Sequence, residues 1–122
     1  MAHDSIRFGR IAATLPVTNI DEAVRFYVDV MGFTKVFENG DPIGFVILER
    51  DDAELHLTLQ PNHQPARFNA AHLIVDDVHA LHGHLQSNGV RIVKGVRDQD
   101  YGMRAFVLED PFGNRIDVGQ PM

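Results

Sequence analysis

The sequence predicts an α+β fold in which two βαβββ modules form a curled mixed sheet shaped like a cup. The chain repeats itself, because Leu15 and Val17 match Leu73 and Val75 at one constant offset. Residues 45–49 (FVILE) likewise match residues 105–109 (AFVLE), at nearly the same offset. Each copy also contains one apolar stripe of helical period among short strands. A repeat of this length indicates two copies of one supersecondary unit.

A length of 122 residues suits a single domain that spans residues 1–122. The break between the modules is expected at residues 60–69 (QPNHQPARFN), which contain two prolines and two asparagines. The modules therefore cover about residues 8–60 and 69–120. A four-stranded sheet with a helix on one face leaves its other face open, and two such faces can enclose a pocket.

The first module is expected to begin with a strand over Arg10–Val17 and a helix whose N-cap is Thr18, with Asp21 completing a variant of the capping box. Apolar residues then recur at helical spacing, and Gly32 ends the helix. These residues are Ala23, Phe26, Tyr27 and Val30. Three strands follow, with a hairpin turn at Asp51-Asp52: Thr34–Glu38, Gly44–Glu49 and Glu54–Leu59.

The second module follows the same plan from Ala71 onward. Asp76 or Asp77 is expected to cap a helix that ends at Gly89. The core face of this helix should consist of Val78, Leu81 and Leu85, so His79, His82 and His84 should face water. The strands after it are expected at Arg91–Val96, Met103–Glu109 and Arg115–Gly119.

Composition excludes several functions. A net charge of −6 argues against non-specific binding to nucleic acid or to an anionic membrane. The chain contains no cysteine, so disulfides, thiolate nucleophiles and cysteine zinc sites are absent. The opening residues have neither a basic segment nor a continuous apolar run, and no stretch approaches the roughly 20 apolar residues of a membrane span. We therefore expect a cytoplasmic protein.

Residues 108–118 (LEDPFGNRIDV) indicate a strand, a tight turn and a second strand. After the turn, Arg115, Asp117 and Gly119 share one face of the strand. An acid in the middle of a strand that lines a cavity has three interpretations. Asp117 could be a metal ligand, a contact for a cationic ligand, or an ordinary residue paired with a neighbour such as Arg115.

Four segments carry a resemblance to a known family: LPVTNIDEAVRFYVDVMGF, ELHL, HLIVDDVHALHGHLQSNGV and YGMRAFVLEDPFGNRIDV. They resemble the vicinal oxygen chelate superfamily of glyoxalases, bleomycin-resistance proteins and extradiol dioxygenases, over about residues 10–119. Within it the chain is most similar to the bacterial bleomycin-resistance type, which shares the proline at the position of Pro16. That resemblance implies a homodimer that pairs modules across two chains, often with the first strand exchanged around the proline.

Enzymes of the superfamily hold one divalent metal with four side chains, and the resemblance places these at Ala12, His56, Ala70 and Asp117. An alanine methyl group has no lone pair, whereas catalytic sites usually need three protein ligands. His72 could replace Ala70, which would give a two-histidine, one-carboxylate set of His56, His72 and Asp117. Because a shift of two residues moves a side chain about 6 to 7 Å along a strand, the sequence favours a protein with no metal and no cofactor.

The remaining candidates are apolar and aromatic side chains near the expected mouth of the cup. Tyr101 precedes Gly102 in a region where the bleomycin-resistance pattern carries tryptophan, whose ring could stack on a flat ligand. The smaller tyrosine puts bleomycin itself in doubt as the ligand. The full set of expected ligand-binding residues is Phe33, Phe45, His56, His72, Tyr101, Met103 and Asp117.

Two functions follow from this resemblance. The first is a metal-free protein, related to antibiotic resistance, that sequesters a hydrophobic or cationic small molecule in a groove between two chains. Sequestration requires no chemistry, because the ligand is removed from solution by mass action. The alternative is a metal-dependent lyase, isomerase or dioxygenase that uses His56, His72 and Asp117. An assay for bound metal would separate the two.

Overall fold

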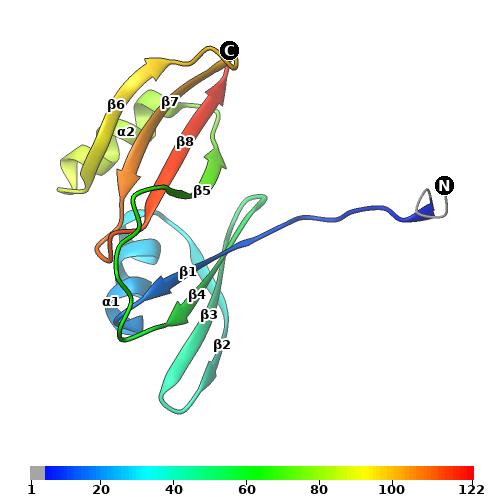
Figure 1. Cartoon of the computed structure of the whole chain (residues 1–122), viewed down its shortest axis with the longest axis vertical. Coiled ribbons are helices and arrows are strands. Elements are labelled where there is room, and N and C mark those ends of the chain that lie inside the picture. Colours follow the sequence, from blue (N-terminus) through cyan, green and yellow to red (C-terminus); the bar gives the residue numbers. More distant parts are fainter. Residues whose placement is uncertain (1–4) are drawn as a thin grey trace.

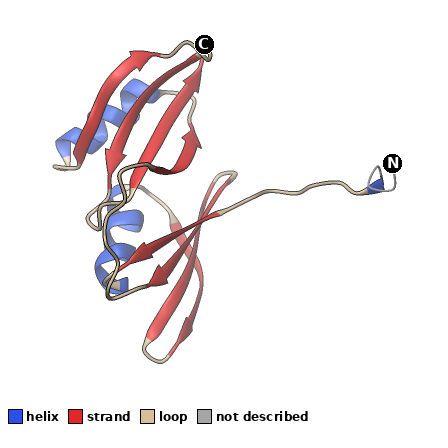
Figure 2. Ribbon diagram, viewed as in Figure 1, coloured by secondary structure: helices blue, strands red, loops and turns tan. Residues whose placement is uncertain are grey.

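The structure is a computed structural model that describes residues 5–122. Over these residues it contains two four-stranded sheets, each with a helical segment on one face, and so confirms the α+β class (Figures 1 and 2). The first module consists of β1 (Ala13–Val17), α1 (Ile20–Arg25), η2 (Phe26–Val30), β2 (Thr34–Gly40), β3 (Ile43–Arg50) and β4 (Ala53–Leu59). The second consists of β5 (Asn69–Ile74), α2 (Val78–Ser87), β6 (Arg91–Asp98), β7 (Met103–Glu109) and β8 (Arg115–Pro121).

The two sheets have the same topology, which confirms the internal repeat. Their strand orders are β1-β4-β3-β2 and β5-β8-β7-β6. In each module the first strand runs parallel to the last, and the remaining pairs are antiparallel. Thr14 lies opposite His56 on the first sheet, and His72 lies opposite Asp117 on the second. Because Thr14 and His72 are equivalent positions of the repeat, the register repeats as well.

The N-cap expected at Thr18 is wrong by one residue. Asn19 caps α1, and its side-chain oxygen accepts a 2.9 Å hydrogen bond from the backbone N–H of Glu22. In α2 the cap is Asp77, one of the two expected residues, which accepts a 3.0 Å bond from the N–H of Ala80. Asn19 and Asp77 are themselves equivalent positions of the repeat. A short side-chain acceptor therefore bonds the same free amide in both modules.

The first helix changes its hydrogen bonding after Arg25. In η2 the backbone N–H of Met31 bonds to the carbonyl oxygen of Phe26 at 3.1 Å, which is the i to i−5 pattern of a π-helix. The adjacent residues Phe26 and Tyr27 are both buried there. Gly32 ends the segment with a φ of +79°, a left-handed conformation that glycine adopts without strain.

The core lies between the helices and the sheets and continues from one module into the other. A single cluster of buried side chains includes Tyr27 and Leu57 of the first module and Leu85 and Phe106 of the second. Val78, Leu81 and Leu85 pack into it, which confirms the expected face of α2. His82 does not simply face water, because its ring lies edge-on to Phe106 with 5.2 Å between centroids.

The first strand is shorter than expected, because the strand predicted at Arg10–Val17 begins only at Ala13. The segment before it leaves the sheet and extends away from both modules (Figure 1). Its apolar side chains have little cover, since Phe8 is 91% and Ile11 94% exposed. We call residues 5–12 the N-terminal arm. The arm pairs with no strand among the described residues of its own chain, which explains the shortened β1.

The other strands agree with the sequence prediction to within two residues at each end. The turn at Asp51-Asp52 is confirmed, and Asp51 has a φ of +51°, which acidic residues in turns tolerate. Among the described residues, no helix is long and apolar enough to cross a membrane.

Candidate ligand-binding site

Each sheet has one face that no helix covers, and the strand register shows which residues lie there. Residues directly opposite each other on neighbouring strands point to the same face. On the first sheet, one open row consists of Thr14, His56, Ile47 and Phe37. The next row consists of Pro16, Thr58, Phe45 and Asn39. We call this face the aromatic wall.

The aromatic wall holds three rings in edge-to-face contact. The Phe45 ring lies 5.4 Å from that of His56 and 6.3 Å from that of Phe37, measured between centroids. His56 Nε2 lies 2.6 Å from Glu54 Oε2, and the same glutamate forms a 3.1 Å ion pair with Arg10. Edge-to-face packing of aromatic rings contributes stabilisation beyond that of burying their apolar surface. The wall is therefore an apolar surface with a carboxylate at one end.

The open face of the second sheet has a different character. One row consists of His72, Asp117, Val107 and Lys94, and the next consists of Ile74, Gly119, Ala105 and Arg97. Ala105 and Val107 are buried but do not belong to the core cluster. Their absence from the core agrees with a position on the opposite side of the sheet. We call this face the basic wall, after its two outer residues.

Asp117 is bonded to His72 and not to Arg115, the neighbour that the sequence suggested. His72 Nδ1 lies 2.8 Å from Asp117 Oδ2, with 39% of the histidine and 18% of the aspartate side chain exposed. An ionised carboxylate only accepts hydrogen bonds, so the imidazole carries a proton on Nδ1. Asp117 thus holds the ring of His72 in one orientation above the wall.

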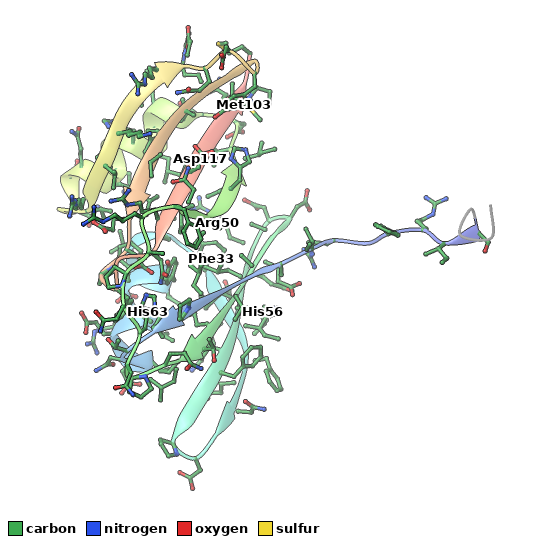
Figure 3. All side chains as sticks on the ribbon, viewed as in Figure 1. Phe33, Arg50, His56, His63, Met103 and Asp117 are labelled. Carbon is green, nitrogen blue, oxygen red and sulfur yellow. The ribbon has the colours of Figure 1, made fainter. Side chains whose placement is uncertain are left out.

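Glycine at position 119 leaves room for the side chains around it. A Cβ atom there would lie 3.1 Å from His72 Cε1 and 3.4 Å from Met103 Sδ. His72 and Met103 therefore lie over Gly119, and Asp117 lies two residues before Gly119 on β8. Figure 3 labels Met103 and Asp117 on the second module. This arrangement brings together three of the residues expected from the sequence: His72, Met103 and Asp117.

The other expected residues lie elsewhere. Phe45 and His56 are on the aromatic wall, and Tyr101 is an exposed residue of the turn before β7. Phe33 is only 7% exposed and packs against Tyr27, with 6.2 Å between ring centroids. Its remaining surface borders a cavity of about 600 Å³ between the modules. The ligand-binding residues expected from the sequence therefore lie in four places: the two walls, a turn and the border of a cavity.

The described residues of one chain do not form a metal centre. His56 lies with Glu54 on the first sheet, whereas His72 lies with Asp117 on the second. Within residues 5–122, no group of three or more histidine, cysteine, aspartate or glutamate side chains is close enough to hold a metal ion. Ala12 borders the cavity of about 600 Å³, which is lined mainly by apolar residues. The trio His56, His72 and Asp117 is therefore not assembled within one chain.

The sequence did not single out the cations of the basic wall. In β6, Lys94 and Arg97 are three residues apart, and simple alternation places them on opposite faces. The register shifts between Ile92 and Lys94 and again between Lys94 and Arg97. These irregularities bring both residues to the open face, opposite Val107 and Ala105. Gly95, between them, was the available signal, because glycine within a strand often marks a bulge.

A comparison with known protein families identifies the superfamily of this chain. The family model described as Glyoxalase/Bleomycin resistance protein/Dioxygenase superfamily matches residues 7–118. Since this match spans nearly the whole chain, the protein belongs to that superfamily. No curated protein sequence gives a significant match to the chain.

Solved structures with a similar fold include proteins that bind antibiotics. A bleomycin resistance determinant encoded on the transposon Tn5 is 26% identical, with a TM-score of 0.80 over 93% of this chain and 98% of that one. TnmS3, an antibiotic binding protein from Streptomyces sp. CB03234, is 27% identical, with a TM-score of 0.78 over 96% and 99%. The bleomycin-binding protein from Streptomyces verticillus, solved with copper(II)-bleomycin, is 26% identical, with a TM-score of 0.78 over 96% and 99%.

Proposed function

We propose that this chain is a metal-free small-molecule-binding protein of the bleomycin-resistance type. It sequesters its ligand in a groove between two copies of the chain and carries out no reaction on it. The proposal also includes a cytoplasmic location. Binding alone lowers the free concentration of a toxic compound, and the ligand in turn stabilises the folded protein.

The observation that carries the proposal is the pair of open walls. Each presents apolar side chains on a sheet face without a covering helix, and binding sites typically combine such side chains with a few polar groups. The aromatic wall offers Phe37 and Phe45, while the basic wall offers Met103 and a bonded His72–Asp117 pair. Similarity to proteins named for binding bleomycin or another antibiotic supports the same role.

The N-terminal arm supports a homodimer. Ile6, Phe8 and Ile11 are largely exposed on a segment that pairs with no strand in the described part of its own chain. Exposed apolar residues of this kind mark interaction sites. In the proposed dimer, each arm packs on the second copy, and the aromatic wall of one chain faces the basic wall of the other. Tyr101 would then lie at the rim of the groove.

A thermal-shift screen tests this function. The protein is heated with a panel of aromatic antibiotics that includes bleomycin, alongside the variants Phe45→Ala and Lys35→Ala. Lys35 lies opposite Leu48 on the helix-covered face of the first sheet, so its variant serves as a matched control. We expect a ligand that raises the melting temperature of the wild type and of Lys35→Ala but much less that of Phe45→Ala. No shift with any compound would contradict the proposal.

A further inference from the structure

We propose that the basic wall binds an acidic group, so that the ligand is a flat aromatic compound bearing a carboxylate, sulfonate or phosphate. This inference rests on the proposed function and narrows its ligand class. It departs from the hydrophobic or cationic ligand that the sequence alone suggested through Asp117. The argument depends on which charged groups face the groove and which of them already have partners.

Lys94 and Arg97 stand in neighbouring rows of the same open face. Rows on one face of a sheet are about 6 to 7 Å apart along the strands. Both side chains are long enough for their charged ends to meet at one bound anion. Between them and the His72–Asp117 pair lie Ala105 and Val107, whose small side chains leave the cations above the surface.

These cations have no counter-charge within the described part of the chain. The structure of residues 5–122 records no ion pair to Lys94, Arg97 or Arg115. By contrast, Arg104 on the helix-covered face of the same sheet bonds to Asp98 at 2.7 Å, and Arg91 at the end of β6 bonds to Glu109 at 2.9 Å. Arg115 Nε is buried without an acceptor among the described residues. Three cations without an ion pair among the described residues, Lys94, Arg97 and Arg115, therefore share this wall.

The carboxylate beside these cations, that of Asp117, already has a hydrogen-bond partner. Asp117 accepts the hydrogen bond of His72, and its carboxylate is mostly covered. The overall charge of −6 would not attract an acid from solution. Since charges in water are screened beyond about 8 Å at physiological salt, the local cations decide which ligand binds. A sulfonate or carboxylate placed between Lys94 and Arg97 would form charge-assisted hydrogen bonds.

The rest of the groove fits a flat apolar body. His72 and Met103 cover Gly119 and so form the surface on this side of the groove, and the aromatic wall of the second copy would face it with Phe45. An aromatic acid would place its ring between these surfaces and its charged group at β6. Charges on an edge strand can instead prevent sheets from pairing. That role predicts an effect on self-association and none on ligand choice.

Two dyes that differ in one group test the inference. 1-Anilinonaphthalene-8-sulfonate carries a sulfonate, and N-phenyl-1-naphthylamine has the same rings without it. Both become fluorescent in apolar sites, so their dissociation constants follow from titration. We expect the wild type to bind the sulfonate about tenfold or more tightly than the neutral dye, because a desolvated charge-assisted contact has this magnitude.

Each of the variants Lys94→Gln and Arg97→Gln should weaken binding of the sulfonate several-fold, and the double variant should weaken it about tenfold or more. Binding of the neutral dye should change less than twofold in all three. Arg104→Gln is the control, since it removes the same charge from the opposite face of the same sheet. Unchanged circular dichroism and melting temperature would establish that each variant folds. Both side chains are exposed, so we expect no loss of fold.

Three outcomes would overturn the inference. Equal affinity for both dyes in the wild type would refute acid recognition and leave the proposed function standing. An altered dimer dissociation constant in the double variant, with dye preference unchanged, would assign the cations to self-association or edge protection. Binding of neither dye would count against the apolar groove, and hence against the proposed function as well.

Discussion

The hydroxyl group of Tyr27 donates a 2.7 Å hydrogen bond to Oδ2 of Asp110, and so joins the helix of the first module to the turn of the second. The Asp110 carboxylate also accepts bonds from the backbone N–H groups of Phe112 and Asn114, at 2.9 and 2.8 Å. Both Tyr27 and Asp110 are buried. The side chain of Asn114 in turn donates to the carbonyl oxygen of Pro16 at 2.8 Å. This buried network fixes the two modules to each other.

Replacing Tyr27 with phenylalanine should destabilise the protein. The substitution keeps the ring but removes one donor from a buried carboxylate, a loss of about 1.5 to 3 kcal/mol in the free energy of unfolding. Urea denaturation measures the change. Tyr101→Phe is the control, because that tyrosine is exposed and its variant should lie within about 0.5 kcal/mol of the wild type. Equal stability of the two variants would contradict a structural role for the bond.

The same bond should make stability depend on alkaline pH. Burial raises the pKa of Tyr27 well above its usual value, and the negative charge of Asp110 raises it further. Above pH 10, the tyrosine of the unfolded chain loses its proton while the folded protein keeps it, so the free energy of unfolding falls as pH rises. Urea curves between pH 8 and 10.5 should show a steeper loss in the wild type than in Tyr27→Phe. Parallel pH profiles would count against this linkage.

Removing apolar side chains from the N-terminal arm should weaken the proposed dimer. We expect the double variant Phe8→Ser/Ile11→Ser to dissociate at concentrations where the wild type remains a dimer, because both residues need cover that their own chain does not provide. Light scattering coupled to gel filtration gives the mass of each. Val36→Ser, half exposed on the edge strand β2, is the control. A monomeric wild type at micromolar concentration would refute the dimer.

The purified protein should contain far less than one Fe, Zn, Ni or Mn per chain when no chelator is used. The donors that remain are divided between two sheets, and two of the four family positions are alanine. Elemental analysis by mass spectrometry checks this directly. One metal per chain, lost in both His56→Ala and Asp117→Ala but retained in His79→Ala, would instead favour the metal-dependent enzyme.

The variant Asp117→Asn tests whether the ligand carries a negative or a positive charge. Removing the carboxylate should tighten binding of the aromatic sulfonate roughly twofold, since two strand spacings separate the charges by about 10 Å, where unit charges interact by roughly 0.4 kcal/mol in water. The melting temperature should fall only slightly, because the His72–Asp117 pair is partly exposed. Titrations at low and high salt measure the effect. Weaker binding of a cationic dye such as thioflavin T, most evident at low salt, would make Asp117 a cation contact.

The repeat made most of the fold predictable from the sequence. Matching residues at a fixed offset defined the modules, and alternation placed every strand except the first to within two residues, because buried faces impose a strict period. The repeat even contained the correct cap, since Asn19 and Asp77 are related by the same offset as Leu15 and Leu73. Local capping rules alone do not distinguish Thr18 from Asn19, because both are short side chains with an oxygen acceptor.

The site was less predictable, because its geometry depends on features that periodicity does not record. Two register shifts in β6 bring Lys94 and Arg97 to one face. The partner of Asp117 is His72 on a distant parallel strand, whereas the sequence suggested a neighbour on its own strand. The arm leaves its sheet at Ala13, and no described strand of its own chain pairs with it. Each of these depends on contacts between distant segments.

The division of the two walls between modules has a genetic consequence in the proposed dimer. Each groove would take its aromatic wall from one chain and its basic wall from the other. A cell with one allele damaged at Phe45 and another damaged at Arg97 would assemble mixed dimers in which one groove carries both lesions and the second carries none. Two alleles that each abolish protection alone should therefore complement each other, whereas two lesions on the same wall should not.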